Sequence, residues 1–493
     1  MTVSFNNIPQ SIRVPLFYAE VDASRAGYFQ QQNRTLIVGQ KLAAGTAAAD
    51  TPVFCSSQDQ AKAFFGVGSM LERMVKAYRD NDAFGEVWCL PLADNGAGTA
   101  AASTITVTGP STAAGTINLY IAGQRVQVAV ASGDANTAIA SAINSAINAN
   151  TSLPVTSTVA SGVVTLTARH KGELGNDIQV SANYLGSLGG ETTPAGVGLA
   201  FASTVTGATN PVLTTALANL SDEVFDYVVH PYTDTTSLTA LGSYFDDVTG
   251  NWSYAKQLYG GGFTARRGTV SALQTAGAAR NDQHMSTLGF NGSPTPAYEV
   301  AAMYGAQCAK SLSIDPARPL QTLPLVGMMA PPVATRFSLT ERNTLLFTGI
   351  ATTYIESGVV RIERAVTNYR QNTFGQADPS YLDVETLFTL AYVLRNLKYR
   401  ITQKFPRHKL ANDGTRFGDG QAIVTPKIIR AEILAGYAEL ENLGIVENRT
   451  AFEANLIVER SATDPNRVNV LYPPDLVNQL RIFAVLAQFR LNY

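Results

Sequence analysis

The chain has 493 residues, of which 45% are hydrophobic and 15% are charged, and 36 Lys and Arg against 38 Asp and Glu give a net charge of -2. This composition excludes an intrinsically disordered chain, and the length indicates two to four domains rather than one small module. The charge balance provides no general attraction for a phosphate backbone, so we expect no direct nucleic-acid binding.

The first residues contain no basic leader followed by an apolar run, so we expect no secretory signal. No window approaches the roughly 20 apolar residues that span a bilayer, which excludes an integral membrane protein. The three cysteines, Cys55, Cys89 and Cys308, are widely spaced in apolar surroundings. We expect buried free thiols rather than a disulfide framework or a zinc site.

Residues 1–33 contain scattered apolar positions and two prolines without a helical period. Such a segment cannot bury its apolar groups alone, so it is predicted to be an extended arm that docks elsewhere on its own chain or on a neighbouring one. The apolar residues assigned to this arm are Phe5, Ile8, Val14, Leu16 and Tyr18.

Residues 34–94 begin an α/β unit, with strands expected at 35–38 and 86–90 and helices at 58–65 and 70–78. Residues 95–210 then have only seven charged side chains in a background of Ala, Thr, Ser, Gly and Val. Short alternating runs, turn residues and one helix around Ile139, Ile143 and Ile147 predict an inserted, mostly β domain.

The α/β alternation resumes over residues 211–380, which favours a partly parallel sheet with helices on both faces. A C-terminal α+β domain is expected over 381–478, with a long helix at 381–405 and a second at 426–442. The last apolar run, in residues 479–493, predicts a strand that must find a sheet edge. Its apolar residues are Ile482, Val485, Leu486, Phe489 and Leu491.

The long helix has an apolar stripe that we assign to the core, made of Leu390, Leu394, Leu397, Ile401 and Phe405. A run of basic residues flanks this stripe: Arg395, Lys398, Arg400, Lys404, Arg407 and Lys409. These basic flanks either meet an acidic partner or form a solvated rim, and the pattern alone leaves both interpretations open.

The sequence gives little support for a catalytic function. The chain lacks a Gly-x-Ser-x-Gly elbow, and only His230, at a predicted strand end near Asp226, keeps open a hydrolase on an α/β fold. The run 260–262 is expected to form a tight turn, since it lacks P-loop and dinucleotide-binding spacing. The acidic loop 413–420 is also expected to be a turn, so we expect no catalytic residue, cofactor or metal.

The chain, most strongly in its C-terminal half, resembles the tail sheath protein of Mu-like contractile bacteriophages. The resemblance rests on Ile8-Pro9, Arg13-Val-Pro-Leu16, Gly172-Glu-Leu-Gly-Asn-Asp-Ile178, Gly289-Phe-Asn-Gly-Ser-Pro-Thr-Pro296, Ile362-Glu-Arg364, Val366-Thr-Asn-Tyr369, Tyr381-Leu-Asp-Val-Glu-Thr-Leu387, Lys404-Phe-Pro-Arg407, Asp413-Gly-Thr-Arg416, Gly420-Gln-Ala-Ile-Val-Thr-Pro426, Asp464-Pro-Asn-Arg467 and Pro473-Pro-Asp-Leu-Val-Asn-Gln-Leu-Arg481. These pieces cover nearly the whole chain in one linear order.

The resemblance implies a structural polymer rather than an enzyme. Subunits of this family form six-fold rings that stack helically around an inner tail tube and contract to drive the tube through the host envelope during genome delivery. It also implies a subtilisin-like fold for the central α/β domain, an outward-facing insertion, and a tube-proximal C-terminal domain.

The implied partners are further copies of the chain, the tail tube protein, and the baseplate and tail terminator proteins, in a virion tail assembled in the host cytoplasm. Strand exchange through the two arms would join the copies, and the basic residues of the long helix would face the tube. An R-type bacteriocin or a related contractile injection machine remains an open alternative.

Overall fold

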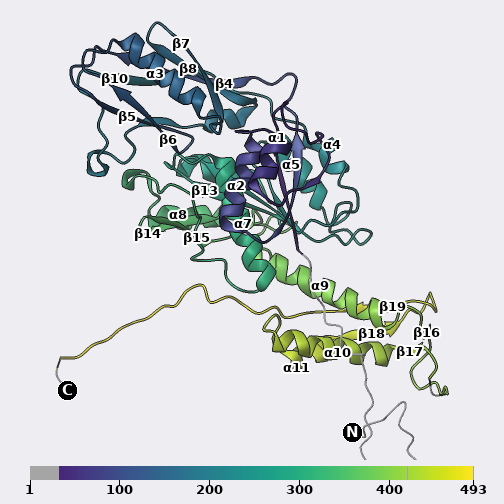
Figure 1. Cartoon of the computed structure of the whole chain (residues 1–493). Coiled ribbons are helices and arrows are strands. Elements are labelled where there is room, and N and C mark those ends of the chain that lie inside the picture. Colours follow the sequence, from purple (N-terminus) through teal and green to yellow (C-terminus); the bar gives the residue numbers. More distant parts are fainter. Residues whose placement is uncertain (1–32, 419, 492–493) are drawn as a thin grey trace, which may run out of the picture.

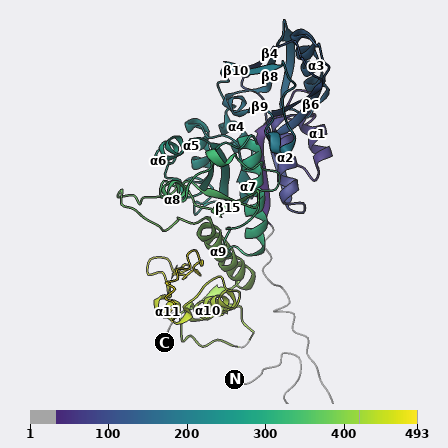
Figure 2. The same ribbon diagram turned by 90° about the vertical axis from the view of Figure 1, so that its left-hand side faces the viewer.

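The computed structural model describes residues 33–418 and 420–491, which form three parts along the molecule (Figures 1 and 2). A central α/β part lies between an inserted β-rich part and a smaller C-terminal part. The predicted arm residues Phe5, Ile8, Val14, Leu16 and Tyr18 lie outside the described residues.

A six-stranded sheet forms the central part, in the order β13-β12-β11-β1-β3-β2. Neighbouring strands are parallel except for β2, which pairs antiparallel with β3 at one edge. The strands are β1 (Arg34–Gln40), β2 (Val53–Phe54), β3 (Glu86–Leu92), β11 (Tyr227–Val229), β12 (Gly261–Arg267) and β13 (Met285–Phe290). Continuous apolar strands of this kind are buried on both faces.

Helices cover both faces of this sheet. Ile37 of β1 lies in the same core as α2 and α7, whereas its neighbours Leu36 and Val38 lie in a second core with α4 and α5. This alternation follows from the two-residue period of a strand. The helices are α1 (Gln58–Phe65), α2 (Met70–Asn81), α4 (Leu213–Ala218), α5 (Thr235–Phe245), α6 (Val270–Ala278), α7 (Ala297–Ile314) and α8 (Leu339–Phe347). The predicted multidomain α/β class is therefore confirmed.

The glycine run 260–262 does not form the expected turn, because it leads directly into β12. A Cβ atom at Gly260 would lie 2.5 Å from the carbonyl oxygen of Phe225. The glycine is needed for this close approach of two backbones. A hairpin of β14 (Thr352–Glu356) and β15 (Val359–Arg364) completes the central part.

The inserted part contains two antiparallel sheets, with the strand orders β10-β4-β8-β7 and β6-β5-β9, and helix α3 (Asn136–Ala149). The strands are β4 (Ala100–Thr108), β5 (Gly115–Ile121), β6 (Gln124–Val130), β7 (Val155–Ala160), β8 (Val163–Lys171), β9 (Val180–Ala182) and β10 (Gly198–Val205). Ile139, Ile143 and Ile147 of α3 are buried in its core, as their spacing predicts. The chain enters and leaves side by side, because Thr99 pairs with Ala208.

The C-terminal part starts with α9 (Val384–Lys404), which reaches from the central part to α10 (Pro426–Asn442) (Figure 1). Leu387 and Phe388 belong to the central core, whereas Val393 belongs to the C-terminal core. The remaining elements are α11 (Arg449–Asn455) and the strands β16 (Lys409–Leu410), β17 (Ile423–Val424), β18 (Ile457–Arg460) and β19 (Val468–Leu471).

The predicted core stripe of α9 is wrong in part. Leu397, Ile401 and Phe405 pack against the C-terminal core, but Leu390 and Leu394 are only half-buried, and Val393 is fully buried. A single straight stripe cannot describe this helix because its two ends bury different faces in two different cores.

Cys55, Cys89 and Cys308 are buried free thiols, as expected. Within the described ranges, no helix is long and apolar enough to cross a membrane.

Candidate functional site

Residues 482–491 extend away from the body of the protein (Figure 1). The expected strand is absent in a single copy, since no ladder partner for these residues lies within the described chain. Their large apolar side chains are 69% to 88% exposed: Ile482, Phe483, Val485, Leu486, Phe489 and Leu491. Burying one such side chain contributes about 1.5 to 3 kcal/mol. The described part of the chain offers this segment no surface that would bury these side chains.

The β18–β19 hairpin offers a second incomplete surface. Its inner side chains Val458 and Val468 pack against the C-terminal core, whereas Ile457, Val470 and Leu471 are 51%, 40% and 58% exposed. The two strands form a sheet of their own. Isolated two-stranded sheets are marginally stable, and their unpaired edges accept further strands.

The basic residues of α9 and of the segment that follows it, up to Lys409, fall into two groups. Arg395 donates to the Asp226 carboxylate and to the Tyr259 carbonyl oxygen. Arg400 binds Glu432 at 3.1 Å and also Glu439 of α10. These two side chains are 15% and 17% exposed, so they join elements of their own chain.

The other four basic residues are exposed. Lys404 binds Glu432, and Lys409 lies 3.3 Å from Gln421. Lys398 and Arg407 make no side-chain ion pair within the part of the chain that the structure describes. The charge that can meet a partner is therefore smaller than the sequence suggests.

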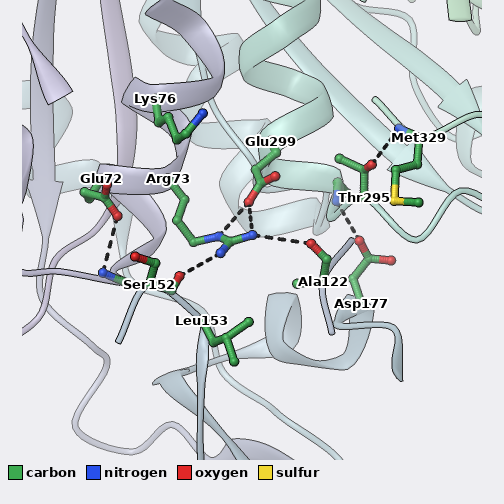
Figure 3. Close-up of polar contacts among 12 residues, drawn as sticks. Glu72, Arg73, Lys76, Ala122, Ser152, Leu153, Asp177, Thr295, Glu299 and Met329 are labelled. Atoms are coloured by element: carbon green, nitrogen blue, oxygen red, sulfur yellow. Dashed lines mark hydrogen bonds and ion pairs between the residues drawn. The ribbon is translucent and has the colours of Figure 1, made fainter. Parts of the chain in front are cut away.

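A buried arginine of the central part, ion-paired within that part, binds the inserted part (Figure 3). The Nε of Arg73 in α2 lies 2.6 Å from Oε1 of Glu299 in α7, and their side chains are 4% and 14% exposed. The same guanidinium donates to the carbonyl oxygens of Ser152, at 2.8 Å, and Ala122, at 3.4 Å, in two loops of the insertion. Burial opposes the charged guanidinium, but Glu299 outweighs this effect and raises the pKa of Arg73.

A second ionic contact lies beside the first. Asp177 of the insertion binds Arg267 at the end of β12, and it accepts from the Ala297 amide at 2.7 Å, at the start of α7. Arg267 also donates to the Thr295 carbonyl oxygen at 2.8 Å. The insertion is thus held by buried or half-buried charges at two points rather than by a flexible linker.

A third contact involves His170 of β8. Its Nε2 accepts from the Met70 amide at 3.0 Å, so Nδ1 carries the proton and donates to Asp94 at 2.9 Å. Asp94 also accepts from Gln40 at 2.7 Å and from the Lys171 amide at 3.1 Å. Burial raises the pKa of Asp94, but these hydrogen bonds outweigh it, so the pKa is lowered.

The hydrolase interpretation fails on geometry. Asp226 precedes β11 and His230 follows it, so the two residues lie at opposite ends of a strand, about 13 Å apart. Asp226 is held by Arg395 and by the Arg34 amide, at 2.8 Å. Burial lowers the pKa of His230 to about 4, which leaves a neutral ring. No group of three or more potential metal ligands occurs among the described residues.

Three protein-family models match the chain: the phage tail sheath protein beta-sandwich domain over residues 96–198, the phage tail sheath protein central domain over 206–368, and the phage tail sheath C-terminal domain over 376–490. The Mu-like prophage FluMu tail sheath protein of Haemophilus influenzae is 45% identical over 492 residues, which cover 99% of this chain and all of the relative. This chain belongs to the Mu-like phage tail sheath proteins.

Among solved structures, the sheath tail protein of Desulfitobacterium hafniense is 12% identical with a TM-score of 0.49, covering 94% of this chain and 97% of that one. The PVC sheath complex of an extracellular contractile injection system in its contracted state is 11% identical with a TM-score of 0.48, covering 98% of both chains.

The sequence did not single out the contacts that hold this sheath protein together internally. Arg73 lies in an otherwise apolar helix face, and Asp177 is one of the seven charges of the insertion. A charge in such surroundings was the signal available in the sequence. The partner of Arg73, Glu299, lies 226 residues further along the chain, and the partner of Asp177, Arg267, lies 90 residues further along.

Proposed function

We propose that this protein polymerises through exchanged arms into stacked six-fold rings around an inner tail tube, and that the resulting sheath contracts to drive the tube through the host envelope. The observation that carries this proposal is residues 482–491, an apolar extended segment without a strand partner among the described residues of its own chain. An extended segment and an open sheet edge complete one another by backbone hydrogen bonds, with alternate side chains giving register.

The acceptor in this proposal is the β18–β19 hairpin of a neighbouring copy. Its exposed Ile457, Val470 and Leu471 supply an apolar face, and its edges supply free backbone groups. Because donor and acceptor are different surfaces, the contact is heterologous: it closes around a ring and continues along the axis. Residues 1–33 supply the second exchanged arm in this proposal.

The remaining assignments of this proposal rest on the family resemblance. The central domain comprises residues 34–94 and 211–380 and takes a subtilisin-like fold, and the insertion, residues 95–210, faces outward. The C-terminal domain, residues 381–478, faces the tube through Lys398, Lys404, Arg407 and Lys409, and residues 479–493 form the C-terminal arm. Arg395 and Arg400 then stabilise the domain rather than contact the tube.

Contraction in this proposal is a population shift from a metastable extended polymer, held by the tube and the baseplate, to a state with larger contacts between copies. The partners are the tail tube, baseplate and tail terminator proteins of a virion tail assembled in the host cytoplasm. The same geometry serves the sheath of an R-type bacteriocin or another contractile injection machine.

Deletion of residues 482–493 tests the proposal. We expect a folded protein with an unchanged far-ultraviolet circular dichroism spectrum that forms no ordered tubes in electron micrographs, while the full chain forms hollow helical tubes. Deletion of residues 1–20 should have the same effect. Ordered tubes from either truncated protein would refute arm exchange.

A further inference from the structure

The chain between β19 and the free segment follows a defined path. After β19 it runs back along α9 toward the central part of the molecule (Figure 1). Leu476 forms a bridge with Val446, the Glu447 amide donates to the Asp475 carbonyl oxygen at 2.9 Å, and the Val477 amide donates to Ile445 at 3.2 Å. Residues 475–477 are therefore tied to the C-terminal domain.

Arg481 ties the same segment to the first turn of α9. Its Nη2 lies 2.8 Å from Oε2 of Glu385 and 3.2 Å from Oδ1 of Asp383. The Arg481 side chain is 11% exposed, whereas the adjacent Leu480 and Ile482 are 71% and 80% exposed. Of the described residues beyond 478, Gln479 and Arg481 are half-buried and the others are exposed.

The two carboxylates are held by their own surroundings. The Glu385 side chain is fully buried, and its other oxygen accepts from the Leu320 amide at 2.6 Å. Asp383 is bound by Arg364 through two hydrogen bonds of 2.9 Å. Both acids lie at the start of α9, where negative charge is favoured by the helix dipole. Removing the Arg481 side chain would leave the buried Glu385 carboxylate without this cation.

We propose that Arg481 is a positioning residue that fixes the point and direction in which the arm, residues 482–491, leaves the subunit. The neighbour-binding part of this proposal rests on the proposed function. Because the anchor is the first turn of the helix that joins both cores, tension applied to the arm by a neighbouring copy acts on α9. Without the anchor, residues 478–481 are held to the body by two hydrogen bonds of 3.4 Å, from Asn478 to Glu447 and from Gln321 to the Leu480 carbonyl oxygen. Their residual motion must then be lost when the arm binds.

The anchor is tested first on unassembled protein. A spin label at Leu480→Cys reports local motion, and Cys55, Cys89 and Cys308 are buried and will not compete for the label. We expect a restrained label in the native background and a mobile one with Arg481→Gln. Arg490→Gln, which makes the same change on the exposed arm, should leave the label restrained. Arg481→Lys should restore part of the restraint.

The second measurement is the protein concentration needed to form sheath tubes. We expect Arg481→Gln to raise it about tenfold and Arg318→Gln, the same change at an exposed position of the central part, to leave it within twofold. Glu385→Gln provides an independent variant that removes the opposite charge while keeping the side-chain shape, and it should act in the same direction.

The outcomes separate the anchor from the sheath function. A label at residue 480 that is mobile in the native background would overturn the anchor even if tubes form. A label released by Arg481→Gln with unchanged tube formation would overturn the positioning role. If the native chain forms no tubes, the proposed function fails, while the label still decides whether Arg481 anchors the segment.

Discussion

Arg73 and Glu299 form an ion pair between α2 and α7, with Nε and Oε1 2.6 Å apart, and the same arginine reaches two loops of the inserted domain. The Arg73 side chain therefore joins α2 to α7, which pack against each other on the central sheet. It also binds the inserted domain. A buried charge network of this kind resists deformation of the subunit, because separating its partners is costly.

Replacing Arg73 by Met should lower the free energy of unfolding by about 3 to 5 kcal/mol, because Glu299 then remains buried without a cation. Chemical denaturation measures the change. Lys76→Ala, which removes an exposed i,i+4 pair with Asp80 on the same helix, should cost at most about 1 kcal/mol. Equal effects of the two substitutions would show that the buried pair does not hold the insertion.

Lowering the pH should weaken the contact at Asp94. Its pKa is lowered from 3.8 in the folded protein, so its contribution to stability is present above pH 4 and is lost as the pH falls through the folded-state pKa. Asp94→Asn should reduce stability at pH 7 by about 1 to 2 kcal/mol and should flatten the loss of stability between pH 5 and pH 3.

Urea unfolding across this pH range provides the test. Asp222→Asn, an exposed aspartate of the central domain, serves as the control and should leave both the stability and its pH dependence close to native. A native pH profile in Asp94→Asn would contradict the assignment.

The arm should present one face to its acceptor, since strand side chains alternate. Phe483, Val485, Phe489 and Leu491 share one parity of the arm, whereas the other parity carries two large apolar side chains, Ile482 and Leu486, among Ala484, Gln488 and Arg490. Replacing Val485 and Phe489 together by Lys should weaken sheath assembly about 100-fold or more, since two cations would enter an apolar interface. Replacing Ala484 and Gln488 by Lys keeps the spacing and charge and should leave assembly nearly native, as sedimentation of tubes will report.

We expect the exposed basic residues Lys398 and Arg407 to affect assembly on the tail tube but not the stability of the subunit. Lys398→Glu with Arg407→Glu should leave the free energy of unfolding within about 0.5 kcal/mol of native, because neither side chain has a partner within the described chain, but should weaken assembly on tail tubes. Lys310→Glu with Arg318→Glu changes the net charge equally on exposed positions of the central domain.

The measurement for this pair of variants is co-sedimentation with purified tail tubes. Assembly unaffected by the α9 reversals, or equally affected by the control, would assign Lys398 and Arg407 to a solvated rim. Arg400→Glu is unsuitable for this purpose, since it would place two acids of α10 against a third and destabilise the helix pair.

The local sequence pattern predicted helices well where the hydrophobic period and the capping residues agree. The helices 58–65 and 426–442 have the predicted bounds, and Ser57 and Thr425 accept amides at their starts. The strand β10, rich in Ala, Ser and Thr, was not predicted, because small and polar residues give a weak strand signal. The helix α11 was not predicted either, because seven residues are too few to establish a period.

The sequence by itself determined the α/β class of this sheath protein, its β-rich insertion and the apolar character of residues 482–491, because periodicity and composition are local properties. Only the tertiary structure decided which charges are available to partners. Arg395 and Arg400 resemble Lys398 and Arg407 in the sequence, yet their acids, Asp226 and Glu432, come from distant segments. Ion pairing depends on distance in space, and one-dimensional pattern does not contain that distance.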